Sequence, residues 1–419
     1  MPYIADLHTH SLYANACSPE LTIPNLAKWA NLKGIDLLGS GDCLHPNWLE
    51  ELKKNLQPLP SGFYEHAGIK FVITTEVACI YNEYGKTRKI HLLIFLPSIN
   101  SAEKLANELK NRGVNIGYEG RPTIKLSVKH LCEIVFKITP KAIIIPAHIW
   151  TPWFGLFGSK SGYDFFAECF GEFSEKIYAV ETGISSEPAM NWRVADLDKK
   201  TIVSFSDLHS LPRMGREVTC FDGEFSYDGL LDALKTEKVL STIEFYPEEG
   251  KYHFSGHRKC NIVYTPKELF EFGDICPVCK QPLTEGVMPR LENLSTRTEA
   301  DLKLKKEHGI IKSDLFPHRP GFRMLIQLEE IIAESLEKQV KTKAVQDKYE
   351  HMVTAIDGEL KILTQTPIDI LSMVAGDRIA QGIKKVREGD IYIEPGYDNT
   401  YGKVTIWHGE EEKDQRSLF

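Results

Sequence analysis

The sequence contains no long apolar run and no N-terminal targeting pattern. No stretch approaches the roughly 18 consecutive apolar residues that a membrane-spanning helix needs, so we expect no membrane span. The first ten residues, MPYIADLHTH, lack a basic start followed by an apolar core and therefore do not resemble a secretory signal. These two absences predict a cytoplasmic protein.

Cysteine and net positive charge are also scarce. Nine cysteines in a chain of 419 residues are typical of thiols and metal ligands rather than of a disulfide framework. The net charge of −8 argues against a protein coated with basic residues for nucleic-acid binding, although it is compatible with a local basic face. The apolar share of 42% and the length indicate a globular protein of two or three domains.

The first 245 residues alternate between short apolar runs and helix-like stretches. Seven such alternations predict a parallel α/β barrel, in which catalytic groups gather at the C-terminal ends of the strands. The expected strands are residues 3–7, 35–38, 69–74, 90–96, 142–146, 177–180 and 201–205, and the expected helices include 23–32, 102–111 and 128–136.

The pattern changes after residue 245. Residues 246–295 are punctuated by glycine, proline and cysteine, as in ICPVCKQPLTEG, and predict a small metal-bound module. Residues 296–409 predict a mainly helical C-terminal domain that ends in a hairpin around Pro395–Gly396. Its helices are expected in 325–345 and 367–386, and the polar residues 410–419 predict a flexible tail.

Residues that commonly bind metals recur where the expected strands end. His8 and His10 are separated by one residue, and Asp207 and His209 repeat this spacing. Because alternate residues of a strand point to the same face, both imidazoles could bind one metal. One such histidine alone is more often a packed residue. A whole set at successive strand ends is hard to explain by packing, because clustered carboxylates and imidazoles need cations to offset their desolvation. The predicted ligands of a multinuclear site are His8, His10, Cys17, Asp42, Glu76, His91, His148, Asp207 and His209.

The segments DLHTHS at 6–11 and SDLH at 206–209, together with the single ligands between them, resemble the polymerase-and-histidinol-phosphatase (PHP) superfamily. This resemblance implies a distorted seven-stranded barrel, phosphoester hydrolysis, and two or three divalent metals, which would be zinc, magnesium or manganese. It also implies catalytic roles for Asp207, His209 and Glu76. Two positions depart from the usual pattern: Asp42 stands where histidine is common, and Cys17 stands where histidine or aspartate is usual.

A second metal site is predicted in the module. GHRKC at 256–260 and ICPVC at 275–279 supply one H-x2-C and one C-x2-C pair, and two knuckles so spaced close a tetrahedral zinc site. Four nitrogen and sulfur ligands leave no open position, so this zinc would be structural. The ligands are His257, Cys260, Cys276 and Cys279, with His253 as a rival to His257.

The barrel, the zinc module and the C-terminal part together resemble the endonuclease Q family of DNA-repair nucleases over nearly the whole chain. The matching motifs are GHRKC…ICPVC, LIQLEEIIAE and GDRIAQGIKKVREGD…IEPGYDNTYG. The resemblance implies a DNA partner containing deaminated bases. The strand would be cut on the 5′ side of a deaminated base, which would be uracil, hypoxanthine or xanthine, or on the 5′ side of an abasic site. A base that differs only in its pairing edge has to be inspected outside the stack, which implies base flipping.

Two segments are candidates for DNA contact. The loop IWTPWFGLFGSKSGYD carries Trp150, Trp153, Phe154 and Lys160 and would offer a stacking surface, or alternatively a lid packed on the barrel. The helix of residues 376–387 carries Arg378, Lys384 and Lys385 and would contact phosphates, or alternatively form a solvated basic face.

The chain ends in Gln415, Leu418 and Phe419, which match the start of the sliding-clamp motif Q-x-x-L-x-x-F-F. A clamp is therefore a predicted partner, and the alternative is a frayed end with one chance apolar pair. Two other functions compete with the nuclease. One is a small-molecule phosphatase of histidinol-phosphatase type, and the other is a barrel kept as a scaffold in a DNA-binding protein.

Overall fold

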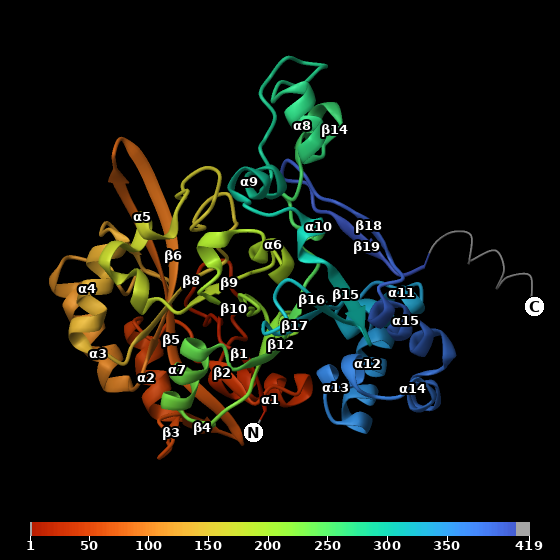
Figure 1. Cartoon of the computed structure of the whole chain (residues 1–419). Coiled ribbons are helices and arrows are strands. Elements are labelled where there is room, and N and C mark those ends of the chain that lie inside the picture. Colours follow the sequence, from red (N-terminus) through yellow and green to blue (C-terminus); the bar gives the residue numbers. More distant parts are fainter. Residues whose placement is uncertain (1, 408–419) are drawn as a thin grey trace, which may run out of the picture.

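The computed structural model describes residues 2–407, and each of the seven apolar runs expected to form a strand does so. The strands are β1 (Tyr3–Asp6), β2 (Leu37–Gly39), β5 (Ile69–Glu83), β6 (Lys86–Leu96), β8 (Ile143–Pro146), β9 (Ala179–Glu181) and β10 (Thr201–Val203). The surrounding helices include α1 (Ile23–Lys33), α3 (Ile99–Asn111), α4 (Val128–Ile138) and α7 (Tyr227–Thr236) (Figure 1). The predicted mixed α/β fold is confirmed.

The expected all-parallel strand arrangement is wrong at β6. Strands β1, β2 and β5 are parallel neighbours, but β6 runs antiparallel to both β5 and β8. Only Tyr84 and Gly85 join β5 to β6, and so short a link can only return the chain in the opposite direction. Within residues 2–407, β9 and β10 pair only with each other, so hydrogen bonds do not close the predicted barrel.

Packing nevertheless joins the seven strands at one interior. Alternate residues of a strand face the same side, and one buried residue from each strand belongs to a single apolar cluster. These residues are Ala5, Leu37, Val72, Leu93, Ile145, Ala179 and Val203. The shared cluster brings the strand ends to a common edge, which is where the predicted metal ligands lie.

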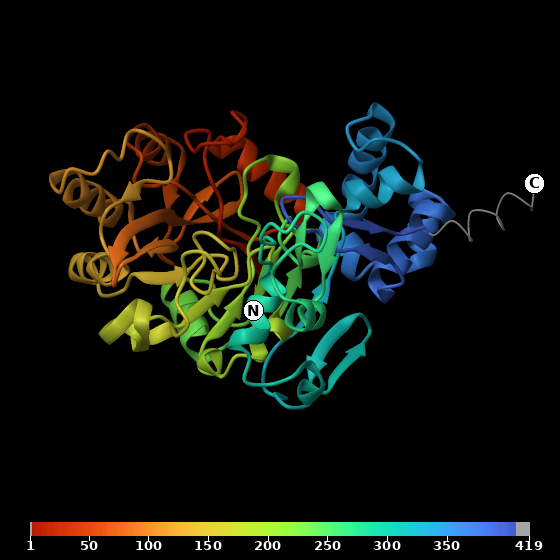
Figure 2. The ribbon, with the colours of Figure 1, turned by 90° about the horizontal axis from the view of Figure 1, so that it is seen from above.

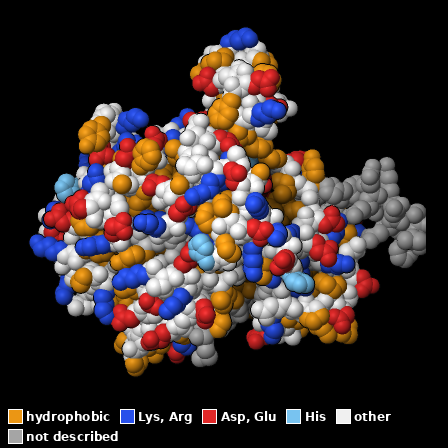
Figure 3. Space-filling model, viewed as in Figure 1, with side chains coloured by type: hydrophobic (Ala, Val, Ile, Leu, Met, Phe, Trp, Pro, Cys, Tyr) orange, Lys and Arg blue, Asp and Glu red, His pale blue; other side chains and the backbone are white. Residues whose placement is uncertain are grey.

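The second half of the chain adds strands to the sheet, and between two of these strands it forms a separate module. Strands β11 (Val218–Phe221) and β12 (Val239–Glu244) continue the sheet beyond β1, followed by β17 (Gly321–Met324), β16 (Ile310–Ser313) and β15 (Leu304–Glu307). Between β12 and β15 the chain forms a module with β13 (Ser255–His257), β14 (Ile262–Tyr264) and α8 (Pro266–Phe272). It returns through α9 (Val287–Leu294). The module projects from the body of the molecule (Figures 1 and 3).

The C-terminal helices lie to one side of the sheet in both ribbon views (Figures 1 and 2). They are α11 (Leu328–Ser335), α12 (Lys343–Ile356), α13 (Glu359–Thr364), α14 (Ile368–Ala375) and α15 (Asp377–Glu388), followed by the hairpin of β18 (Tyr392–Glu394) and β19 (Lys403–Thr405). Each of the two expected long helices is divided in two. In the second, the break falls at Gly376, whose φ of +93° ends a helix without the strain a side chain would add. No helix between residues 2 and 407 has both the length and the apolar character needed to cross a membrane.

A buried ion pair fastens these helices to the first half. Lys33 at the end of α1 places its Nζ 2.6 Å from Glu359 Oε2, and the two side chains are 1% and 3% exposed. Tyr349 donates its hydroxyl to the same oxygen at 2.7 Å, and the Leu328 N–H donates to Glu359 Oε1 at 3.1 Å. Both oxygens of the carboxylate thus accept hydrogen bonds, as a buried charge requires.

Replacing Lys33 with Met should therefore leave Glu359 buried and uncompensated. We expect a loss of about 3–5 kcal/mol in the free energy of unfolding, measured by urea denaturation. Lys53→Met is the matched control. Its ammonium pairs with Glu50 and Glu103 at a 36%-exposed surface position, so the loss should stay below about 1 kcal/mol. Equal losses in the two variants would contradict the assigned role of the Lys33–Glu359 pair.

Candidate metal centre

The structure brings most of the predicted ligands together at the strand ends. Three groups have ligand atoms within 4.8 Å of one another: His8, His10 and Glu76; His10, Asp207 and His209; and Glu76, His91 and His148. A parallel bridge between Thr9 and Leu208 aligns the end of β1 with the Asp207 segment. Because His10 and Glu76 each belong to two groups, the three groups form one continuous donor set.

Glu76 lies at the middle of this set. Its Oε1 is 2.6 Å from His91 Nδ1 and 3.1 Å from His148 Nε2, and its Oε2 is 3.6 Å from His10 Nε2. Burial alone would raise the pKa of the Glu76 carboxyl, but the neighbouring imidazoles of His91, His148 and His8 hold that pKa well below its usual range. The residue is therefore a carboxylate, the form that binds cations.

The imidazole nitrogens around Glu76 converge on its carboxylate, as the nitrogens of metal ligands converge on an ion. His91 Nδ1 and His148 Nε2 lie 3.2 Å apart and face the same carboxylate oxygen. Burial lowers the pKa of His91 to about 4, so its ring is neutral and carries a lone pair. The buried His8 Nε2 has no hydrogen-bond partner among the described residues. Nitrogen and carboxylate donors converging in this way fit zinc, manganese or iron.

Further carboxylates orient the two histidines of β1. His8 Nδ1 is 2.9 Å from Glu181 Oε1, and the His148 N–H donates to Glu181 Oε2 at 2.7 Å. His10 Nδ1 is 3.1 Å from Asp42 Oδ1, while Ser11 donates to Asp42 Oδ2 from both its N–H and its hydroxyl at 2.6 Å. These contacts direct each Nε2 toward the centre. Asp42, predicted as a ligand, thus lies behind His10 and outside the three donor groups.

Three of the predicted residues have an unusual backbone conformation. Asp42, His148 and Asp207 have φ values of +45°, +31° and +47°, a region that side-chain-bearing residues rarely adopt. Each follows a strand, and the left-handed turn places His148 and Asp207 within the donor groups and Asp42 against His10 Nδ1. Neighbouring glycines make room for this: a Cβ at Gly183 would overlap His148, and one at Gly120 would overlap the Asp42 carboxylate. Strain of this kind concentrates at functional sites.

Two further residues near the centre differ from expectation. Cys17 is half-buried and belongs to none of the three donor groups. Burial, followed by the charges of Asp42 and Asp207, raises the pKa of its thiol, so the thiol keeps its proton unless a cation lies nearby. Arg121, which the sequence analysis missed, places Nη1 3.1 Å from Glu76 Oε2. No sequence motif marks it, because it comes from the loop before β7 (Thr123–Ile124).

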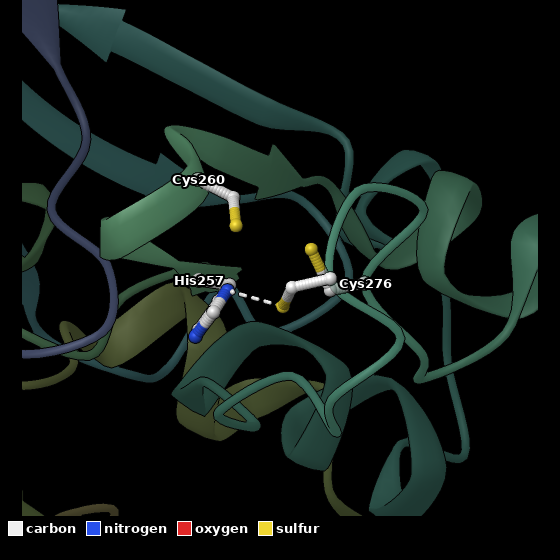
Figure 4. A group of neighbouring side chains, drawn as sticks. His257, Cys260 and Cys276 are labelled. Atoms are coloured by element: carbon white, nitrogen blue, oxygen red, sulfur yellow. Dashed lines mark hydrogen bonds between the residues drawn. The ribbon is translucent and has the colours of Figure 1, made fainter.

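The second predicted site is also assembled. His257, Cys260, Cys276 and Cys279 have ligand atoms within 4.8 Å of one another, and His257 Nδ1 is 3.3 Å from Cys279 Sγ (Figure 4). The β13–β14 hairpin positions the first pair, and a bridge between Ile275 and Pro282 closes the loop that carries the second. The rival His253 is buried away from these thiols, in the wall of a cavity.

The candidate DNA-contact residues divide into exposed and buried ones. Trp150 is 1% exposed and donates Nε1–H to Asn191 Oδ1 at 2.8 Å, whereas Trp153 is 39% exposed and Lys160 is exposed. Phe154 packs on His91 with ring centroids 4.3 Å apart. Trp153 and Phe154 line a pocket of about 500 Å³ beside the metal centre.

The candidate residues of α15 are mostly engaged within the protein. Arg378 lies over the Trp407 ring at 4.5 Å, and Lys385 is 5% exposed and 2.7 Å from Asp390 Oδ2. Lys384 is the exposed one.

The clamp-motif residues Gln415, Leu418 and Phe419 lie outside the described residues, so the clamp remains a prediction.

Known proteins resemble this chain over its full length. The family model of the MJ0043 C-terminal domain matches residues 327–390. The crystal structure of the lesion-specific endonuclease PfuEndoQ from Pyrococcus furiosus is 29% identical, with a TM-score of 0.84 over 100% of both chains. A structure of endonuclease Q with a 27-mer duplex carrying an abasic lesion is also 29% identical, with a TM-score of 0.83 over 97% of both chains.

A curated relative is considerably longer. The uncharacterized protein MJ0043 of Methanocaldococcus jannaschii is 26% identical over 342 residues, a match that covers 74% of this chain and 41% of MJ0043. The present chain thus spans less than half of that relative. The structural matches confirm the predicted resemblance to endonuclease Q.

The module gives a direct test of the closed zinc site. Cys276→Ser should remove one bound zinc per chain and lower the melting temperature, because structural zinc contributes its binding free energy to folding. Elemental analysis and differential scanning calorimetry measure the two effects. Cys220→Ser, a half-buried thiol outside the four-ligand group, is the control and should keep its zinc. Unchanged zinc in Cys276→Ser would contradict the assignment.

Proposed function

We propose that the chain is a DNA-repair endonuclease that hydrolyses the phosphodiester on the 5′ side of a deaminated base or an abasic site. The continuous donor set around Glu76 carries this proposal, since a site that gathers several divalent ions suits phosphodiester hydrolysis. The full-length likeness to endonuclease Q supports DNA as the substrate. Uracil, hypoxanthine and xanthine are the lesions that the resemblance implies.

The chain's own residues bind the ions and present an opening to the substrate. When bound, divalent ions activate water and neutralise charge on the phosphoryl oxygens. His8 and His10 are fully buried, whereas the side chains of Asp207 and His209 are 17% and 32% exposed, so these two mark the mouth of the site. Arg121, with a side chain 23% exposed, stands at the same mouth and can donate to a phosphoryl oxygen.

The aromatic pocket supports inspection of a flipped base. Its lining includes Trp153, Phe154, Tyr252 and Tyr401, and its volume of about 500 Å³ suits a small planar ligand. Because Phe154 packs on His91, a base in this pocket would lie next to the metal centre. Aromatic walls stack on any base, so they provide affinity, and polar groups would have to provide selectivity.

The two competing functions explain less of the chain. A small-molecule phosphatase of histidinol-phosphatase type needs the metal centre but neither the zinc module nor the C-terminal helices. A scaffold does not need a buried set of metal-binding side chains. Burying these charged groups lowers the stability of the fold, and a scaffold function would not explain why they are buried.

Duplex oligonucleotides with one uracil, hypoxanthine, xanthine or abasic site, compared with undamaged duplex, test the proposal. The protein with divalent metal should nick only damaged strands, on the 5′ side. Asp207→Ala should lower the rate at least roughly 100-fold, the typical effect of removing one charge-stabilising group from an active site. Asp232→Ala, which removes an exposed ion pair with Lys238, is the control. Phosphomonoester hydrolysis without nicking would favour the phosphatase instead.

The pocket has its own test. Trp153→Ala should raise KM on uracil-containing duplex by about tenfold, because base–aromatic stacking is worth roughly 1–3 kcal/mol. Steady-state kinetics with the four lesions measure this effect. On the abasic substrate, which has no base to stack, the KM should change least. Equal changes with all four lesions would argue against base stacking on Trp153.

A further inference from the structure

The β5–β6 hairpin extends well beyond the sheet. Its strands pair without interruption from Ile73–Leu96 to Glu83–Lys86. Strand β7 flanks β5 only at Ala78 and Cys79, so the outer part is a two-stranded ribbon. At its tip Tyr84 is 92% exposed. Figure 1 shows this ribbon projecting on the same side as the zinc module.

The residue at the tip is not one that the turn requires. Tyr84 and Gly85 have φ values of +49° and +77°, as in two-residue turns of type I′. Such turns favour Asn-Gly, because a bulky side chain is disfavoured at positive φ. With 92% of Tyr84 exposed, packing within the chain does not account for an aromatic residue there either.

The two strands of the ribbon also carry residues of the candidate metal centre. Glu76 belongs to β5 and His91 to β6, and His91 pairs with Ala78 at the start of the outer part. At about 3.3 Å per residue, the five residues from His91 to Lys86 span roughly 17 Å. Bases are stacked about 3.4 Å apart along one strand of DNA, so the tip reaches roughly five base pairs from the scissile phosphate.

The outer part also carries positive charge. Lys86 is exposed and Lys89 is half-buried, and neither forms an ion pair with any residue from 2 to 407 that the structure describes. Lys89 Nζ lies 5.5 Å from the Phe154 ring centroid, beside the aromatic pocket. The acidic residue of the tip, Glu83, is already engaged by Lys129 and the Tyr163 hydroxyl.

Contacts with Tyr163 hold the outer part of the ribbon in place. The Tyr81 and Tyr163 hydroxyls are 2.7 Å apart, and the Arg88 guanidinium lies 3.9 Å from the Tyr163 ring centroid. In both ribbon views the loop of residues 149–163 lies between the hairpin and the zinc module (Figures 1 and 2). Figure 3 shows the two projections as separate protrusions along one edge. A duplex with its scissile phosphate at the metal centre would pass beside the hairpin.

We infer that the β5–β6 hairpin is a DNA-binding arm. Lys86 pairs with a phosphate, and Tyr84 packs against the duplex within about five base pairs of the cut. This inference rests on the proposed function, because it places the same substrate on a surface outside the catalytic centre. The positive charge and the direct connection to Glu76 and His91 favour DNA over a protein partner.

Tyr84→Asn tests the inference without endangering the fold, since Asn-Gly is the preferred sequence for this turn. On a duplex that extends ten base pairs to either side of the lesion, KM should rise about tenfold with kcat unchanged. On a five-nucleotide single strand, too short to reach the tip, both constants should equal those of the wild type. Lys86→Gln should reduce the slope of log affinity against log salt by about 1.

The control variant is Met373→Gln, which removes another exposed apolar side chain, 73% exposed on α14, and should leave KM unchanged. Wild-type KM for Tyr84→Asn on the long duplex, or an equal rise on both substrates, would overturn the inference while leaving the proposed function intact. Absence of nicking by the wild-type protein would instead overturn the proposed function. A melting temperature equal to that of the wild type shows that Tyr84→Asn is folded.

Discussion

The need to compensate buried charge governs the architecture of this protein. Glu76 is 1% exposed, and its carboxylate has four imidazoles and one guanidinium within 4 Å. Isolated charges in such a position would be expelled or neutralised. Here Glu181 and Asp42 fix the histidine rings, glycines make room, and three residues adopt left-handed turns. The strands around the centre supply a rigid frame in which these contacts remain compatible.

The way in which buried charge is compensated also differs between the two candidate metal sites. In the zinc module four candidate ligands converge, and none of the other residues that the structure describes joins this group. This arrangement is typical of a closed structural site. In the centre around Glu76 the donor groups share residues, and two of the side chains are partly exposed. An opening on one side is what a substrate phosphate requires, and this difference is the reason why the proposed hydrolysis is assigned to this site and the expected structural zinc to the other.

Periodicity and spacing in the sequence predicted the parts that depend on local order. Seven strands, the principal helices and the H-x2-C/C-x2-C cluster are where the pattern places them. Contacts between distant segments were not predictable in this way. Glu181 lies 173 residues from His8, and Arg121 comes from an irregular loop, so no motif connects either with the centre. The direction of β6 was misjudged because the two-residue turn at Tyr84–Gly85 was not recognised as a hairpin.

The loop of residues 149–163 is held from both sides, and it thereby connects the β5–β6 hairpin with the zinc module. Arg290, at the base of the zinc module, donates to the carbonyls of Phe157 and Tyr163 at 3.0 and 2.8 Å. Arg88 of the β5–β6 hairpin packs on the Tyr163 ring from the other side. The two projections therefore meet at one residue of the loop that carries Trp153 and Phe154. A ligand that displaced either projection would act on Tyr163, and through it on the pocket wall and on the Phe154 ring that covers His91.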